Sequence, residues 1–243
     1  MGAQRQHVAT PSTPETALTP AILTGMTAEA RIARRTGLPV ACSGADPYAV
    51  ALRLLDDGAA GLVSFGIAGG LAPLAPPGTL VVATAVAGDD MTILASPAWR
   101  RALLTALPQA RAGAIVGASR PAVTVKDKAG LYARTGALAV DLESYAVARA
   151  CRERGRPFAV LRAVADPAGR ALPPAALTGL DGDGKMAPGA VLAQVLRDPG
   201  QLIGLCRLGL DLARAMAALN AAARAFPRGF LRLDPLERVG DVA

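Results

Sequence analysis

The residues best able to carry chemistry follow short apolar runs of the sequence. Ligands of open α/β sheets gather at the carboxyl ends of strands, so the side chains just after each apolar run are the informative ones. Four segments fit this description: 24–29, 65–71, 141–144 and 163–166. They place Glu143 and Asp166 at the edges of strongly apolar segments, where a carboxylate can accept two hydrogen bonds from vicinal hydroxyls, or hold a proton for donation if its pKa is raised.

Each of these places also has a structural explanation. Asp166, followed by Pro167, fits a turn or a helix cap. Glu143 fits the first turn of a helix, where the helix dipole favours an acid. The glycine cluster at 66–70 lets backbone amides approach a phosphate, a ribose or an attacking water, or it forms a tight turn. Taken singly, these residues leave catalysis and structure as open alternatives.

The chain has a single histidine, His7, among 243 residues. It lies within residues 1–20, a Thr- and Pro-rich stretch without apolar periodicity, which we expect to be a disordered leader. A Ser-His-Asp triad, a Cys-His pair and an imidazole zinc site are therefore not expected in the folded body. Acid–base chemistry must fall to carboxylates, hydroxyls or the three lysines, and we expect no metal.

Three cysteines, Cys42, Cys151 and Cys206, are widely spaced and odd in number. This argues against a disulfide framework and against a clustered thiolate metal site. Residues 1–20 lack the charged start, apolar stretch and cleavage site of a signal peptide. The expected setting is the reducing cytoplasm.

The net charge of +7 comes from 26 basic residues against 19 acidic ones; the basic residues are spread along the whole chain, and only 3% of residues are aromatic. This is a poor match to a stacking platform for single-stranded nucleic acid. The densest basic group, at 149–156, fits the wet face and the C-terminal end of one helix. We expect no nucleic-acid partner, whereas attraction to an anionic membrane surface stays open.

Apolar runs alternate with helix-compatible segments throughout, which predicts an α/β fold with a mainly parallel or mixed central sheet. The 52% apolar content can bury a substantial core in a single domain, expected at 21–225. Expected strands are 21–24, 38–42, 62–65, 80–86, 114–118, 122–125, 138–140 and 157–165, with a loop at 66–78. Expected helices are 27–35, 48–57, 98–106, 126–135, 143–154, 189–196 and 201–225.

The last expected helix is amphipathic. Leu202, Leu212 and Leu219 are on the face expected to pack on the sheet, and Arg207 and Asp211 are on the face expected to meet water. Residues 226–243 combine aromatic and basic side chains. They predict a basic amphipathic C-terminal tail that could contact a membrane surface.

Taken in order, four segments resemble the purine nucleoside phosphorylase and nucleosidase superfamily. They are Gly25-Met-Thr-Ala-Glu29, Gly66-Ile-Ala-Gly-Gly-Leu71, Val140-Asp-Leu-Glu-Ser144 and Leu161-Arg-Ala-Val-Ala-Asp166. The resemblance covers roughly 21–225 and implies a single-domain three-layer fold, with a mixed central sheet flanked by helices. Residues 135–144 and 166–174 are most similar to hopanoid-associated phosphorylases, also described as adenosylhopane nucleosidases.

The resemblance implies cleavage of the N-glycosidic bond of an adenine nucleoside, above all adenosylhopane, which releases adenine and a ribosyl or phosphoribosyl hopane in hopanoid side-chain biosynthesis. By family position, Asp166 protonates N7 of the base, Glu143 binds the ribose 2′- and 3′-hydroxyls, and Glu29 orients or deprotonates the attacking water. Asp141 would stabilise the loop around Glu143. Further substrate-binding residues implied in the same way are Leu142, Ser43, Gly44, Ala68, Gly69, Gly70, Pro121 and Ala122.

Some positions differ from nucleosidases for methylthioadenosine. Those enzymes typically carry Ser or Thr where this chain has Ile67, Ser where it has Ala165, and an aromatic residue in the base-contacting loop, where it has Pro121 and Ala122. The differences argue against a plain methylthioadenosine enzyme and leave Asp166 without an identified orienting donor. A soluble substrate, such as methylthioadenosine or adenosylhomocysteine, and a non-catalytic nucleoside-binding protein are the alternatives.

No organic cofactor is expected. Inorganic phosphate stays open as a co-substrate in place of water, because Arg31, Arg34 and Arg162 could bind it or simply solvate the surface. A lipid-linked nucleoside would explain an apolar entrance and peripheral contact with the inner face of the membrane. Members of the family commonly form oligomers, and a homodimer is the simplest expectation.

Overall fold

The computed structural model describes residues 19–177, 197–198 and 200–226. Its strands are β1 (Ala21–Thr24), β2 (Val40–Cys42), β3 (Leu62–Gly70), β4 (Leu80–Ala87), β5 (Thr92–Leu94), β6 (Arg111–Gly117), β7 (Ala139–Asp141) and β8 (Phe158–Asp166). Its helices are α1 (Thr27–Ala33), α2 (Pro47–Asp56), α3 (Pro97–Ala106), α4 (Val125–Thr135), α5 (Ser144–Glu153), α6 (Pro174–Leu177) and α8 (Gln201–Ala225), with a short 3₁₀ helix at Arg34–Thr36.

All of these strands form one mixed sheet in the order β2-β1-β3-β7-β6-β4-β5, with β8 pairing with both β3 and β4. β1, β2, β3 and β8 run parallel to their neighbours in that group, while β4 lies antiparallel to β8 and β7 antiparallel to β3. The long pairing of β3 with β8 brings the glycine cluster of β3 beside the residues that end β8.

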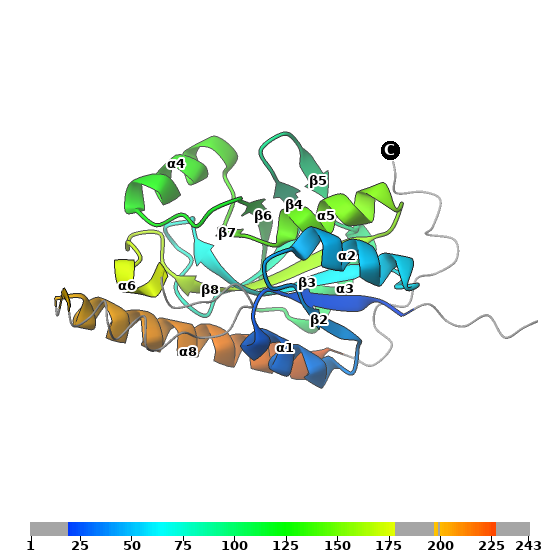
Figure 1. The fold of residues 1–243 in the computed structure, drawn as a ribbon, viewed down its shortest axis with the longest axis horizontal. Coiled ribbons are helices and arrows are strands. Elements are labelled where there is room, and N and C mark those ends of the chain that lie inside the picture. The colour runs from blue at the N-terminus through cyan, green and yellow to red at the C-terminus, as the bar shows by residue number, and fades with distance from the viewer. Residues whose placement is uncertain (1–18, 178–196, 199, 227–243) are drawn as a thin grey trace, which may run out of the picture.

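Helices cover both faces of the sheet (Figure 1). α2 and α5 pack on one face, where Leu55 and Val147 belong to a core cluster with strand residues. α1, α3 and α8 pack on the other face, where Trp99, Leu103 and Leu219 do the same. Burying each such side chain contributes about 1.5–3 kcal/mol. The predicted α/β fold, with a mixed sheet between layers of helices, is confirmed.

The expected loop at 66–78 is partly wrong, because β3 continues through the glycine cluster to Gly70. Neighbouring strands explain the extension: Gly69 and Gly70 pair with Val140 and Ala139 of β7, and β8 lies alongside. The strand expected at 122–125 is also absent, since α4 begins at Val125, and the short edge strand β5 was not expected.

The helix α8 matches its predicted bounds, but the predicted faces are only partly right. Leu219 is buried as expected, whereas Leu202 is 53% exposed. Asp211, expected in water, is buried and forms ion pairs with Arg170 and Arg214. The helix expected at 189–196, His7 and most of the proposed leader and tail lie outside the described residues.

Candidate active site

The carboxylate of Glu29 lies among backbone amides where β1 meets α1. Its Oε2 atom accepts hydrogen bonds from the N–H groups of Gly25 (3.1 Å) and Met26 (2.9 Å), and its Oε1 atom accepts one from Ile67 of β3 (2.7 Å). The side chain is buried, and this burial raises the pKa of Glu29, while nearby Arg162 and the amides act in the opposite direction. Glu29 therefore holds a place where backbone N–H groups converge on an anion.

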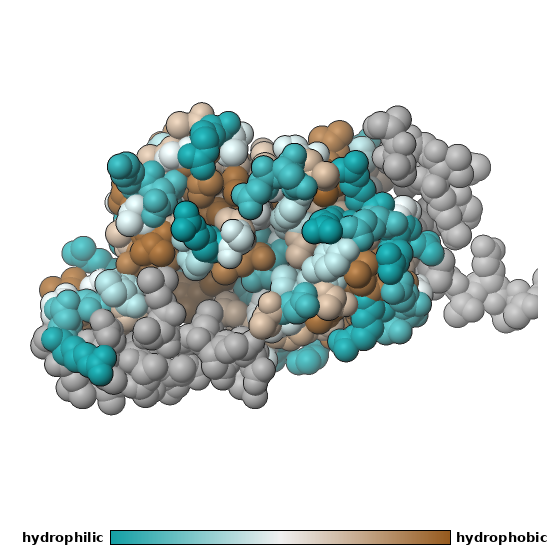
Figure 2. Space-filling view, turned by 45° about the horizontal axis from the view of Figure 1, so that its top comes forward, coloured by the Kyte–Doolittle hydropathy of each residue, from teal (hydrophilic) through white to brown (hydrophobic). Residues whose placement is uncertain are grey.

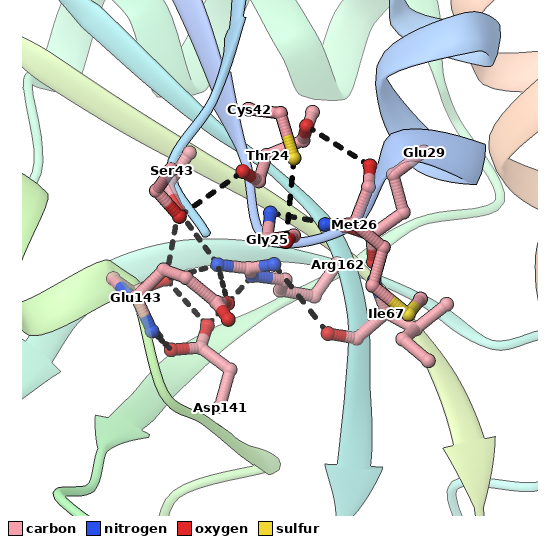
Figure 3. A network of polar contacts seen from close by, with 12 residues as sticks. Thr24, Gly25, Met26, Glu29, Cys42, Ser43, Ile67, Asp141, Glu143 and Arg162 are labelled. Carbon is pink, nitrogen blue, oxygen red and sulfur yellow. Dashed lines mark hydrogen bonds and ion pairs between the residues drawn. The ribbon is translucent and has the colours of Figure 1, made fainter. Parts of the chain in front are cut away.

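Arg162 of β8 is the centre of the polar network shown in Figure 3. Its guanidinium is fully buried and forms ion pairs with Asp141 (Nε to Oδ2, 2.6 Å) and with Glu143 (Nη2 to Oε2, 3.0 Å). It also donates to the hydroxyl of Ser64 (2.7 Å). The idea that Arg162 only solvates the surface is wrong. Arg31 and Arg34, by contrast, are exposed.

Glycines make room for this network. A Cβ atom on Gly25 would lie within 3.0 Å of the Glu143 carboxylate, and one on Gly66 would lie within 3.0 Å of both Arg162 and Glu29. Separations this short are not found for real Cβ atoms, so any side chain at either position would push charged groups apart. The close approach of charged side chains to backbone explains these two glycines.

Glu143 is at the N-terminal end of α5, and Asp141 holds it there. Asp141 Oδ1 accepts hydrogen bonds from the N–H groups of Glu143 (3.2 Å) and Ser144 (2.8 Å). Burial raises the pKa of Glu143 to about 7, with Arg162 opposing and the acids Asp141 and Glu29 adding to the rise. The expected role of Asp141, stabilising the loop around Glu143, agrees with these contacts.

Asp166 ends β8 and is paired in register with Gly69 of β3. Its carboxylate meets the ammonium group of Lys128, which comes from α4. Burial raises the pKa of Asp166, and the Lys128 charge limits this rise. Asp166 comes four positions after Arg162 along β8, a distance of about 13 Å at about 3.3 Å per residue. The strand pair β3–β8 thus carries two charged centres, one around Arg162 and one at Asp166.

Sequence reasoning missed Lys128 and misjudged Arg162, the two cations that hold these acids. One signal for Lys128 was present: it is three residues before Leu131 on the predicted helix, the spacing that places two side chains on one face. The available signal for Arg162 was its position inside an apolar run, which forms the fully buried strand β8.

Around the first centre, Ser43 is buried and donates its hydroxyl to the Thr24 carbonyl (3.2 Å), so it ties the end of β2 to that of β1. Gly44 follows with φ of 54°, a left-handed conformation that favours glycine. Leu142, next to Glu143, is 44% exposed and so offers an apolar side chain at the surface.

Around the second centre, Ala68 is buried in β3 beside Gly69 and Gly70. Ala122 is buried in a small apolar cluster with Leu71, Val116, Ala137 and Val140, whereas Pro121 is exposed.

Within the described residues, no group of three or more His, Cys, Asp or Glu side chains could hold a metal ion. The three cysteines are free thiols, and burial raises the pKa of Cys151. No helix among the described residues is both long enough and apolar enough to cross a membrane.

Residues 6–196 match the model of the phosphorylase superfamily, so the protein belongs to this superfamily. The predicted superfamily is confirmed. Among curated proteins, the futalosine hydrolase of Streptomyces coelicolor is 36% identical in an alignment of 127 residues, and the match covers 44% of this chain and 54% of that enzyme. The chain thus spans about half the length of this curated relative.

Solved structures show the same fold at lower sequence identity. The 5′-methylthioadenosine/S-adenosylhomocysteine nucleosidase from Helicobacter pylori, with butyl-thio-DADMe-Immucillin-A, superposes with a TM-score of 0.65 at 16% identity and covers 89% of this chain and 99% of its own. The native futalosine hydrolase from Helicobacter pylori superposes with a TM-score of 0.57 at 19% identity and covers 63% and 89%, respectively.

Proposed function

We propose that this protein is a nucleosidase that hydrolyses the N-glycosidic bond of a purine nucleoside, with adenine as the expected base. Three lines support the proposal: membership of the phosphorylase superfamily, similarity to proteins named as hydrolases and nucleosidases, and the two charged centres on β3 and β8. Glu29, Glu143 and Asp166 are its working acids.

The observation that carries hydrolysis is the position of Glu29. Convergent amides such as those of Gly25, Met26 and Ile67 would suit a phosphate, but the carboxylate of Glu29 already accepts their hydrogen bonds. The two buried cations of the described residues, Arg162 and Lys128, are both paired with carboxylates. A phosphate ion at the first centre would therefore meet a negative charge, whereas water would meet a hydrogen-bond acceptor.

In the proposed reaction, Glu29 orients the water and takes its proton as the oxygen attacks C1′ of the ribose. The C1′–N9 bond breaks, its electron pair moves into the base, and Asp166 gives a proton to N7. Glu143 accepts hydrogen bonds from the 2′- and 3′-hydroxyls and so fixes the sugar between the two centres. Burial raises the pKa of Asp166, which favours the protonated form that a proton donor needs.

For the substrate, we propose adenosylhopane, in which the nucleoside is attached to a lipid. Exposed apolar side chains support this proposal: Leu142 adjoins Glu143 in the chain, and Leu202, Ile203 and Leu210 of α8 are more than half exposed. Figure 2 shows hydrophobic residues around a hollow on one face of the molecule. Peripheral contact with the cytoplasmic face of a membrane, and assembly as a homodimer, belong to the same proposal.

A soluble nucleoside is the second candidate. The 36% identity with a futalosine hydrolase supports futalosine or a related nucleoside as the substrate. The nucleosidase-like fold supports methylthioadenosine or adenosylhomocysteine. These substrates carry the same N-glycosidic bond, so the two charged centres would act on them in the same way.

A panel of nucleosides tests the proposal. We expect the protein to release adenine from adenosylhopane in detergent micelles faster than from methylthioadenosine or adenosylhomocysteine, and futalosine should be tested for release of its own base. Chromatography of the free base gives the rate, and Glu143→Gln should lower it. Faster release from a soluble substrate would reject the lipid-linked one. Tight nucleoside binding without base release from any substrate would indicate a binding protein instead.

A further inference from the structure

Lys128 is the only lysine among the described residues that is fully buried. A buried ammonium group is costly unless it is paired with an anion and its N–H groups all have acceptors. Here it meets three oxygens: the Oδ2 atom of Asp166, the carbonyl of Pro167 (3.0 Å) and the carbonyl of Arg170 (2.8 Å). The ammonium group can donate three hydrogen bonds, and three acceptors surround it.

The first turn of α4 delivers this ammonium group. Thr124 and Asp127 form a capping box, in which Asp127 N–H donates to Thr124 Oγ1 (3.0 Å) and Thr124 N–H donates to the Asp127 carboxylate (3.1 Å). Lys128 follows directly, with its own N–H donating to the Thr124 carbonyl (3.1 Å). The Leu172 N–H donates to the Val123 carbonyl (2.9 Å), so α4 and the segment after β8 are joined beside the pair.

Asp166 has no second side-chain donor among the described residues. The residue before it, Ala165, is apolar, and the residue opposite it on β3, Gly69, has no side chain. The carboxylate lies beside Gly69, where an added Cβ would stand 3.4 Å from Oδ1 and 3.6 Å from Oδ2. The carboxyl group thus lies beside the glycine cluster with Oδ2 held by Lys128, while Oδ1 has no side-chain donor among the described residues.

We propose that Lys128 is a positioning residue for the proton donor: it anchors Oδ2 of Asp166 and the carbonyls of Pro167 and Arg170, so that Oδ1 carries the proton and faces the purine base. The inference rests on the proposed function, because it takes Asp166 as the acid. Lys128 itself gives no proton to the base, since its N–H groups are already directed to protein oxygens.

The pairing also acts on the reaction itself. As the C1′–N9 bond breaks, N7 takes the proton from Oδ1, and Asp166 changes from a neutral acid to a carboxylate. The Lys128 charge interacts more strongly with that carboxylate than with the acid, so it stabilises the transition state more than the bound substrate. Solvent returns the proton to Asp166 after the base leaves.

Lys128→Met removes the cation and keeps an unbranched side chain, and Lys126→Met on the exposed side of the same helix is the matched control. We expect Lys128→Met to lower kcat by about 100-fold, with KM changed less than about threefold, because the contact acts in the transition state. Lys126→Met should match wild type. A kcat for Lys128→Met within about threefold of wild type would overturn the proposal.

A double-variant comparison separates positioning from a general loss of structure. If Lys128 acts through Asp166, Lys128→Met should lower kcat no further once Asp166→Asn is present. A further drop of similar size in the double variant would show that Lys128 acts elsewhere, and would also overturn the proposal.

A measurement that needs no substrate tests the role of Lys128 separately from the proposed function. In protein carrying carboxyl-¹³C aspartate, the Asp166 signal, assigned by its loss in Asp166→Asn, should titrate at higher pH in Lys128→Met than in wild type. An unchanged titration would overturn the positioning role, even if no substrate were ever cleaved. If Lys128→Met does not fold, Lys128→Gln, which also removes the charge, carries the same expectations and the same contrary result.

Discussion

Backbone amides hold the carboxylate of Glu29 in place, so a substitution of Glu29 has a specific expected effect on the rate of base release. In Glu29→Gln, the amide oxygen can still accept the hydrogen bonds made by one carboxylate oxygen, while the NH₂ group replaces the other acceptor and the side chain can no longer take a proton from water. We expect kcat to fall by at least about 100-fold with the fold intact. Base release measured by absorbance, with circular dichroism as a check of folding, tests this.

The matched control is Glu153→Gln, since Glu153 is exposed and forms its ion pair with Arg149 at the surface. It should keep the wild-type rate. Equal rates for Glu29→Gln and wild type would remove Glu29 from the mechanism.

The pKa of Glu143 predicts how stability changes with pH. Because burial raises this pKa from 4.5 to about 7, the folded protein binds more protons than the unfolded chain between these two values. The stabilisation is therefore complete below pH 4.5 and is lost as pH rises through 7, by at most about 3 kcal/mol. The raised pKa values of Glu29 and Asp166 act in the same direction.

Denaturant unfolding at intervals from pH 5 to pH 8 measures this effect. The free energy of unfolding should fall with rising pH, and Glu143→Gln should reduce the slope, whereas Glu153→Gln should leave it unchanged. A slope that is the same in Glu143→Gln and wild type would show that Glu143 titrates normally in the folded protein.

At the level of single residues, the sequence could identify the three acids but not the cations that pair with them. Glu143 and Asp166 were identifiable because each lies at the edge of an apolar segment, and Glu29 was identifiable from the segment that resembles the family. Lys128 is 38 residues from Asp166 in the chain, and only the packing of α4 against the end of β8 brings the two together. A pairing that depends on tertiary contact leaves no local pattern.

Among the elements, β3 shows the limit of local patterns most clearly. Three glycines in five residues are typical of a loop, and the pairing partners that make them a strand lie more than 65 residues away in β7 and β8. The extended strand matters for the site, because it brings Gly66 against Arg162 and, after a shift of register between Ala68 and Gly69, Gly69 against Asp166.

Substitution of Gly66 in β3 should therefore lower both the stability and the activity of the protein. In Gly66→Ala, the new Cβ would displace Glu29 and Arg162, and we expect a loss of about 1–3 kcal/mol of stability together with a fall in kcat. Thermal unfolding and base release measure the two effects.

Gly209→Ala in α8 is the contrasting change. Nothing lies within 4 Å of its added Cβ, and alanine favours a helix, so it should stabilise the protein by about 0.5–1 kcal/mol with no effect on kcat. A stable and fully active Gly66→Ala would show that the network tolerates displacement.

For the whole molecule, the alternation of strands and helices was enough to predict a mixed sheet covered on both faces. The strand order was not predictable, because β7 inserts between β3 and β6, and β8 pairs with β3 and β4 from outside that path. Such neighbours are far apart in sequence. The site depends on that order, since it brings β8, with both Arg162 and Asp166, alongside β3.

Removal of residues 1–18 should leave the fold and the rate of base release unchanged within about twofold. All three working acids and their recorded partners lie between Thr24 and Arg170, and β1 begins at Ala21. The truncated and full-length chains should be compared by thermal unfolding and by kcat/KM. A truncated protein that folds but releases no base would return His7 and its neighbours to consideration.

The most direct test of hydrolysis at Glu29 is the fate of oxygen from water. The protein should be incubated with its best nucleoside in H₂¹⁸O, with and without inorganic phosphate, and the sugar product analysed by mass spectrometry. We expect base release without phosphate, at a rate that phosphate does not raise, and one ¹⁸O atom at C1′ of a free ribosyl product. Release that requires phosphate, with a phosphoribosyl product, would contradict the assignment of water as the nucleophile.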